Sequence, residues 1–253
     1  MSEFEYETVT STLGDHGVRT IMLHRPEQLN AMNRTLISEV ASSFDDANAD
    51  SETRAIVFTG AGRAFCAGDD RHEHQHPQNE ADALEFVELI QAATRAIVFG
   101  AKPVVGAING WAVGGGFEWA MNCDFSIWAE SARGFFPEVS LNLFVTGGVT
   151  SLLPALVGLN KAREMLFLGE RYDADALLEM GVAWRVVADD QLIQSALEVA
   201  TDLTNLPPLS VRAMKSVLNR TAACDLGQAL QLETEATVAG FMDPETTTRL
   251  KDF

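Results

Sequence analysis

Two glutamates in apolar surroundings are the residues of this sequence best suited to chemistry. Glu118 follows three consecutive glycines in "AVGGGFEWAM", and Glu138 follows two phenylalanines and a proline in "FFPEVSL". Apolar surroundings disfavour the charged form of a carboxyl group, so we expect the pKa of each to rise. Two such carboxyls suit paired acid–base work, in which one holds a water and the other exchanges a proton with carbon. Either could instead be an acid favoured by a helix dipole, or a surface charge.

Two glycine turns offer backbone N–H groups near these acids. The run Gly114–Gly116 lies between an apolar segment and a helix-like segment, and a helix start leaves N–H groups unpaired. The run lacks the Lys-Ser/Thr of a P-loop and does not fit G-x-G-x-x-G, which disfavours a phosphate cradle. Gly68-Asp69 forms a second turn after an apolar strand, and one donor from each turn is a common way to build an oxyanion hole. Tight helix–sheet packing is the other interpretation of the glycine run.

Strands alternating with helices are expected to position these turns. A hairpin with its turn at Asp15-His16-Gly17 opens the chain, and Asp173 is expected to cap a helix that Gly181 ends. Further strands are predicted at 54–60, 104–109, 123–130 and 182–187, with helices at 36–44, 81–99, 148–157 and 161–168. After Asp190 the pattern predicts only helices, at 191–205, 209–221, 225–240 and 244–252.

Four segments, in this order and spacing, resemble the enoyl-CoA hydratase/isomerase family, the crotonase superfamily. They are "HRPEQLNAMN", "AFCAGDD", "KPVVGAINGWAVGGGFEWAMNCD" and "FFPEVSL". The resemblance covers nearly the whole chain and weakens toward its C-terminal end. It implies an α/β fold: a crotonase-like ββα spiral core at 1–195 that carries the active site, followed by an α-helical C-terminal region at 196–253 used in oligomer contacts. Family members are typically homotrimers or dimers of trimers.

The resemblance also implies roles for the residues at the two turns. The backbone N–H groups of Asp69 and Gly115 would hold the oxygen of a thioester carbonyl, so that an enolate becomes accessible. Glu118 would activate a water and Glu138 would relay a proton to or from the α-carbon. Because family hydratases tend to keep both glutamates and many isomerases only the second, we expect hydration of a 2-enoyl-CoA.

The segment after Glu138 departs from the family pattern. Where hydratases usually have a glycine and then a Pro-Gly step, this chain has Asn142, Phe144 and Thr146. These residues alter the wall that helps to hold the water and shapes the acyl pocket. An isomerase, or a hydrolase of a CoA thioester or of a β-diketone C–C bond, is therefore an alternative. A non-enzymatic relative that binds RNA is a third class, which the net charge and both glutamates disfavour.

Coenzyme A contacts are implied by the family alone, and CoA would be part of the substrate, so no separate cofactor is expected. Arg25, Arg34 and Arg71 are candidates for its phosphates or ordinary surface arginines. The substrate- and CoA-binding positions carried over from the family are Gln28, Leu29, Ala31, Ala64, Cys66, Ala67, Gly68 and Gly114.

Composition limits the partners. A net charge of -18 disfavours nucleic acid and anionic membranes, which need clustered Lys and Arg. No leader-like segment or apolar run long enough for a membrane span is evident, and three widely spaced cysteines fit a reducing cytoplasm. His72, His74 and His76 lack a fixed fourth ligand, so a polar loop is favoured over a metal site. Trp111, like the other aromatic residues near the glycine run, is expected in the core, with a place in the wall of the acyl pocket as the alternative for Trp111 or Phe144.

Overall fold

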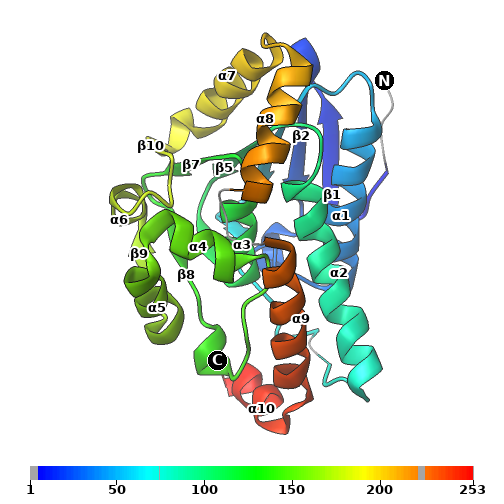
Figure 1. Ribbon diagram of the computed structural model, residues 1–253, viewed down its shortest axis with the longest axis vertical. Helices are drawn as coiled ribbons and strands as arrows, with labels where there is room; N and C mark the ends of the chain where they lie inside the picture. The colour runs from blue at the N-terminus through cyan, green and yellow to red at the C-terminus, as the bar shows by residue number, and fades with distance from the viewer. Residues whose placement is uncertain (1–4, 74, 222–225, 253) are drawn as a thin grey trace.

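A six-stranded sheet forms the larger layer of the protein (Figure 1). The computed structural model describes residues 5–73, 75–221 and 226–252. Only β1 and β2 pair antiparallel, and the other neighbours in the order β1-β2-β3-β5-β7-β10 are parallel. The expected hairpin is confirmed, because His16 and Gly17 take positive φ in the turn between β1 and β2. These strands span Val9–Leu13, Val18–Leu23, Ala55–Gly60, Val104–Ile108, Phe125–Ala129 and Arg185–Val187.

A second, four-stranded sheet alternates with the first along the chain. Its order is β4-β6-β8-β9, and β4, β6 and β8 each follow a strand of the larger sheet. Two strands and a helix therefore recur, which confirms the ββα spiral. The strands of this sheet were not predicted, because segments of two or three residues show no periodicity. They span Ala64–Cys66, Trp111–Val113, Arg133–Phe135 and Tyr172–Asp173.

Helices cover the sheets, and the described residues after β10 contain helices and no strand, as expected. In Figure 1, α9 lies beside α2, and these two helices contact each other. Helix α7 packs on β3, β5 and β7 of the larger sheet. The α-helices α1 to α10 span Arg34–Ala49, Glu80–Val98, Gly115–Asn122, Val149–Val157, Leu159–Leu168, Ala174–Glu179, Leu192–Thr204, Pro208–Thr221, Leu226–Met242 and Pro244–Asp252. The 3-10 helices η1 to η4 span Asp15–Gly17, Pro26–Gln28, Glu138–Leu141 and Asp189–Gln191.

Side-chain caps fix where several helices begin. Asp173 Oδ1 accepts a hydrogen bond from Ala176 N at 2.9 Å, which confirms the expected cap of α6. Gly181, at φ +79°, lies in the turn that follows this helix. Asn33 caps α1 by accepting from Leu36 N at 2.9 Å. These caps satisfy N–H groups that a helix start leaves unpaired.

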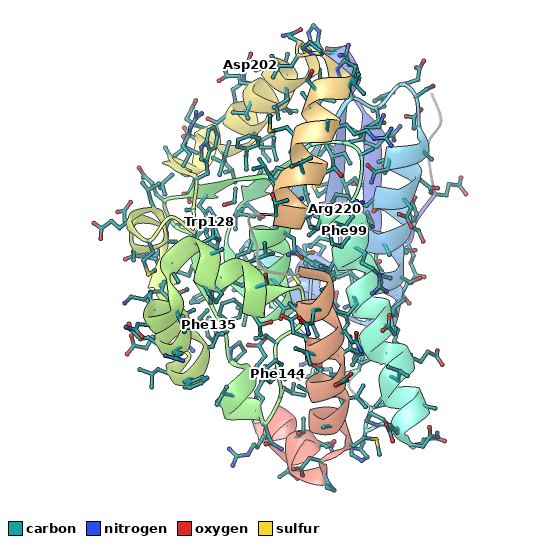
Figure 2. The ribbon with its side chains drawn as sticks, in the orientation of Figure 1. Phe99, Trp128, Phe135, Phe144, Asp202 and Arg220 are labelled. Atoms are coloured by element: carbon teal, nitrogen blue, oxygen red, sulfur yellow. The ribbon has the colours of Figure 1, made fainter. Side chains whose placement is uncertain are left out.

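The core lies between the large sheet and its helices. Trp119 and Trp128 are fully buried, and Trp128 is seen inside the molecule in Figure 2, whereas Asp202 lies at the outer end of α7. Trp111 was expected in the core, and this prediction is wrong: it is 37% exposed, with the Arg171 guanidinium 5.7 Å from its ring centroid. Its side chain follows the outward face of a three-residue strand, which sequence alone does not reveal. In the described part of the chain, no helix is both long and apolar enough to cross a membrane.

Candidate active site

Glu118 is held in the first turn of α3 by a single threonine. Only 1% of its surface is exposed. Thr146 N donates to its Oε1 at 2.8 Å, and Thr146 Oγ1 donates to its Oε2 at 2.5 Å. Burial raises the pKa of Glu118 to about 7, and the two donors from Thr146 oppose that rise. Glu118 is thus a carboxyl group poised to change charge near neutral pH.

Glu138 opens η3 and has fewer hydrogen-bond donors than Glu118. It is 9% exposed, and its Oε2 has no hydrogen-bond partner among the described residues. Burial, then repulsion from Glu118, raises the pKa of Glu138 well above its ordinary range. The Thr146 donors favour charge on Glu118, and nothing comparable meets Glu138 Oε2. Burial and mutual repulsion therefore disfavour ionisation of both carboxyls at once, and the Thr146 donors favour the charge on Glu118.

The two glycine turns meet the same cavity as the glutamates. Gly114 takes φ +51°, and a Cβ there would lie 2.5 Å from Glu138 Oε1, so glycine allows the carboxyl to approach. Gly115 is the first residue of α3, where a backbone N–H has no partner within the helix. Asp69 pairs with Met32 in an isolated parallel bridge, which brings the other turn to this cavity. The assignment of both N–H groups to an oxyanion hole stays a prediction.

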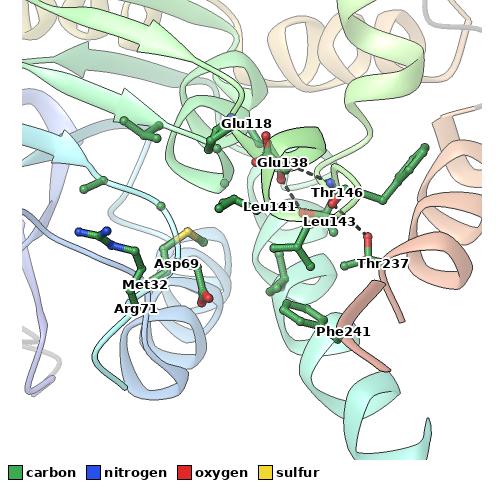
Figure 3. Close-up of a pocket in the computed structure, with 18 of the residues that line it drawn as sticks. Met32, Asp69, Arg71, Glu118, Glu138, Leu141, Leu143, Thr146, Thr237 and Phe241 are labelled. Atoms are coloured by element: carbon green, nitrogen blue, oxygen red, sulfur yellow. Dashed lines mark hydrogen bonds between the residues drawn. The ribbon is translucent and has the colours of Figure 1, made fainter. Parts of the chain in front are cut away.

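The cavity between these groups is small and mostly apolar. It measures about 100 Å³. Figure 3 shows the two glutamates at one end, with Met32, Asp69 and Arg71 on one side and Leu143, Thr237 and Phe241 on the other. Thr237 and Phe241 come from α9, so the C-terminal part of the chain forms part of the wall of this cavity. Other apolar residues of the lining are Ile37, Ile90, Val113, Leu141 and Phe144.

A second cavity of about 630 Å³ adjoins the first. Gln28, Leu29 and Ala31 line it, and Ala67, Asp69, Arg71 and Val113 line both cavities. Gly68 and Gly114 line only the smaller one of the two.

Two residues carried over from the family, Ala64 and Cys66, line neither cavity. Both are fully buried on β4. The Ala64 carbonyl accepts from Asn30 Nδ2 at 2.9 Å, and burial raises the pKa of the Cys66 thiol to about 12. The structure therefore gives their side chains a packing role behind the cavities.

The three candidate arginines have different surroundings. Arg25 contacts Asp70 Oδ2 at 2.9 Å and Glu73 Oε1 at 2.6 Å, so it ties two loops together. Arg34 lies 3.2 Å from Asp82 Oδ1. Only Arg71 lines both cavities, and sequence reasoning missed two further arginines of the larger cavity, Arg63 and Arg171. No motif surrounds either of these, so only the fold could reveal them.

The segment that departs from the family pattern forms the wall next to Glu118. Thr146 supplies both donors described above, and Phe144 lines the cavity. Asn142 takes a left-handed conformation at φ +59° and donates to Asp243 Oδ2 at 2.9 Å. Sequence reasoning missed Gln91 and Glu233, which also contact this wall, since both are distant in sequence and lie in ordinary helical patterns.

The histidine loop shows no cluster suited to a metal. Among the described residues, no group of three or more His, Cys, Asp or Glu could hold one. His76 Nδ1 lies 2.9 Å from Thr247 Oγ1, which links the loop to α10, and His72 lines the larger cavity. His74 lies outside the described residues.

Comparison with known proteins identifies the family of this chain. The family model described as "Enoyl-CoA hydratase/isomerase" matches residues 14–248. The chain is 35% identical over 220 residues to a short-chain-enoyl-CoA hydratase of Clostridium acetobutylicum, covering 87% of this chain and 84% of that one. It is 33% identical over 217 residues to a crotonyl-CoA hydratase of Syntrophomonas wolfei, covering 85% and 83%.

A solved structure extends the likeness to the fold. The crystal structure of an enoyl-CoA hydratase from Mycobacterium avium subsp. paratuberculosis superposes with a TM-score of 0.89 at 26% identity, covering 98% of this chain and 96% of that one. The family model, the relatives and the solved structure all point to the same family. The chain belongs to the enoyl-CoA hydratase/isomerase family.

Proposed function

We propose that this protein is an enoyl-CoA hydratase that adds water across the 2,3 double bond of a short-chain enoyl-CoA. The observation that carries the proposal is the convergence of Glu118 and Glu138 on one cavity that Asp69 and Gly115 also line. Hydration needs a base for the water and an acid for the α-carbon, and the unlike surroundings of the two carboxyls supply one of each.

The proposed reaction starts with Glu118 ionised and Glu138 protonated. Glu118 takes a proton from water as the water oxygen bonds to C3, and the electrons of the double bond move toward the thioester oxygen. The N–H groups of Asp69 and Gly115 stabilise this enolate oxygen. Glu138 then gives its proton to C2, which completes the 3-hydroxyacyl thioester. The pair begins and ends with one proton, so proton exchange between the carboxyls, or with water, restores the starting state.

The adjoining cavities suggest how the substrate lies. The smaller one has room for roughly three waters, which suits a short acyl chain against Leu141, Leu143 and Phe144. The larger one would hold the CoA moiety, with Arg63, Arg71 and Arg171 available to its phosphates and the exposed Trp111 face to its adenine. A few local arginines suffice for such an anion on an acidic chain.

Enoyl absorbance provides the test. We expect crotonyl-CoA to lose absorbance in the presence of the protein, and a long-chain enoyl-CoA to react much more slowly. The same samples are assayed for free thiol, because thiol release would identify a thioester hydrolase. Failure to turn over or bind any acyl-CoA, or turnover of a CoA-free β-diketone instead, contradicts the proposal.

Double-bond isomerisation is the second candidate, and Thr146 is the observation that favours it. Both Glu118 oxygens already accept from this residue, whereas Glu138 Oε2 has no partner among the described residues. A single proton shuttle through Glu138 would need no water on Glu118. Incubation with a 3-enoyl-CoA, followed by mass spectrometry for a product without added water, distinguishes the two reactions.

We further infer a homotrimer or dimer of trimers in the cytoplasm. Helix α8 has an unusually apolar exposed face for an acidic protein: Leu209, Met214, Val217 and Leu218 are 79%, 61%, 56% and 51% exposed. Burial of this face against a second copy of the chain would agree with the oligomers typical of the family. Light scattering should give a multiple of 27.5 kDa, and Val217→Glu should lower it while Thr221→Glu, at the end of the same helix, should not. A monomeric wild type contradicts the inference.

A further inference from the structure

A third buried carboxyl lies behind the catalytic wall. Glu233, on α9, has none of its surface exposed. Its Oε2 accepts from Gly148 N at 2.7 Å, and its Oε1 accepts from Thr150 N at 2.8 Å and Thr150 Oγ1 at 2.6 Å. All of these donors belong to the start of α4, so one side chain from the C-terminal part of the chain satisfies N–H groups that this helix start leaves unpaired.

The segment 146–150 is thereby fixed between two carboxyls. At one end Thr146 donates to Glu118, and at the other Gly148 and Thr150 donate to Glu233. The start of α4 cannot move away from α9 without changing the two bonds to Glu118, because only Gly147 separates Thr146 from Gly148.

Gly147, between the two ends, has no room to absorb such a movement. Its N–H donates to Gln91 Oε1 at 3.3 Å, and its carbonyl accepts from Asn122 Nδ2 at 2.8 Å. A Cβ on Gly147 would lie 2.8 Å from Glu118 Oε2. Gln91 in turn donates to the Leu230 carbonyl of α9 at 3.0 Å. The same helix therefore fixes the segment at two points.

We propose that Glu233 is a positioning residue of the active site, which acts through the 146–150 segment to hold both Thr146 donors on Glu118. This inference rests on the proposed hydration, in which Glu118 must be ionised and aimed at a water. Glu233 does not line the substrate cavity, so its hydrogen bonds reach the active site through the 146–150 segment.

The chemistry of the contact explains why a carboxyl is needed. Two carboxylate oxygens accept the three donors, whereas a glutamine would turn its NH₂ group toward one of the N–H donors. The titratable group that acts on Glu233 is Glu118, from α3; Gln91, from α2, also contacts the segment and is neutral. In the described part of the chain no cation hydrogen-bonds to Glu233, and burial raises its pKa to about 8.

Glu233→Gln tests the proposal, with Glu235→Gln as the matched control on an exposed part of the same helix. We expect Glu233→Gln to lower kcat for crotonyl-CoA roughly 10-fold to 100-fold with KM nearly unchanged, because a misplaced catalytic group affects the chemical step. Glu235→Gln should keep wild-type kcat. Wild-type kcat in Glu233→Gln overturns the proposal.

A double-mutant cycle with Thr146→Val separates positioning from a purely structural role. If Glu233 acts through Thr146, the double variant should lose little more kcat than the worse single variant. Fold-losses in kcat that multiply would overturn the proposal, whatever happens to the melting temperature. If Glu233→Gln does not fold, Thr150→Val replaces it in the cycle, since it removes one donor to Glu233 and leaves the carboxyl in place.

Hydrogen exchange gives a readout that does not need activity. Peptides covering residues 144–150 should exchange faster in Glu233→Gln than in wild type or Glu235→Gln. Equal exchange in all three overturns the inference even if the enzyme is active. A wild type that turns over no enoyl-CoA contradicts the proposed function instead, and the exchange result then still decides whether Glu233 holds this segment.

Discussion

The two sides of the active site are built by different means. On the side of Asp69 and Gly115, glycine turns and the start of α3 bring the backbone to the cavity. On the side of Glu118 and Glu138, the reacting groups are side chains, and Thr146 holds Glu118 through its backbone N–H and its hydroxyl. The first side depends on backbone conformation, and the second on which residues surround two carboxyls.

Because of this difference, we expect the two sides of the active site to respond differently to side-chain substitutions. A backbone donor persists through most side-chain changes, so an aspartate at position 69 is compatible with an oxyanion hole. A carboxyl whose pKa depends on burial and two donors changes when any of those neighbours changes. We therefore expect substitutions on the carboxyl side to affect pH dependence and those on the backbone side to act mainly through geometry.

The largest effect is expected from Glu118→Gln, which removes the base and keeps the shape. Hydration of crotonyl-CoA should fall about 10³-fold in kcat, within the range for loss of a general base. Binding of CoA, measured by calorimetry, should change little because Glu118 does not line the larger cavity, which is proposed to hold the CoA moiety. An active Glu118→Gln variant removes Glu118 from the mechanism.

Gly114→Ala tests the backbone side and should cost about 10²-fold in kcat. A Cβ would strain the positive φ and meet Glu138 Oε1. Gly158→Ala is the matched control, since it has a similar φ of +77° and nothing within 4 Å of the added Cβ. It should lower stability by about 1 kcal/mol without lowering kcat. Equal kcat in the two variants would show that the close approach at Gly114 is unimportant.

Thr146→Val should move the pH profile by removing one donor from Glu118. The wild-type rate should fall as pH drops through about 7, because Glu118 must be ionised. Without the hydroxyl the charged form is less stabilised, so the pKa of Glu118 rises and the acid limb moves to higher pH. We expect kcat at neutral pH to fall about 10-fold. A limb that stays in place or moves to lower pH contradicts this account of Glu118.

The smallest effect is expected from Asp69→Ala, because the N–H and not the carboxylate is assigned a role. The kcat for crotonyl-CoA should change by less than about threefold, which is close to the effect of a neutral surface substitution. A loss of kcat comparable to that of Gly114→Ala would show that the Asp69 side chain takes part in the reaction. The proposed difference between a backbone side and a side-chain side would then be wrong.

The backbone side was also the more predictable from sequence. The glycine turns, the strands before them and the cap at Asp173 all leave local signatures, and the strand–helix alternation follows from periodicity. The presence of Glu118 and Glu138 in one cavity followed from the family resemblance, and their burial from the apolar residues beside them.

Contacts between distant segments could not be predicted. Glu233 meets Gly148 across 85 positions, and Arg25 meets Asp70 across 45, in patterns that look like ordinary charged surface. Trp111 was misplaced because its strand has only three residues, too few to show which face is buried. Thr146 was noticed as a departure from the family pattern, but its bonds to Glu118 required the fold.

Proton NMR of crotonyl-CoA hydration in D₂O tests the central claim most directly. Water addition through one shared proton predicts a 3-hydroxybutyryl-CoA with one deuterium at C2 and an oxygen at C3, formed by wild type and lost in Glu118→Gln. Deuterium at C2 or C4 without an oxygen at C3, or no reaction in wild type, would contradict the account of Glu118 and Glu138 as a water-adding pair.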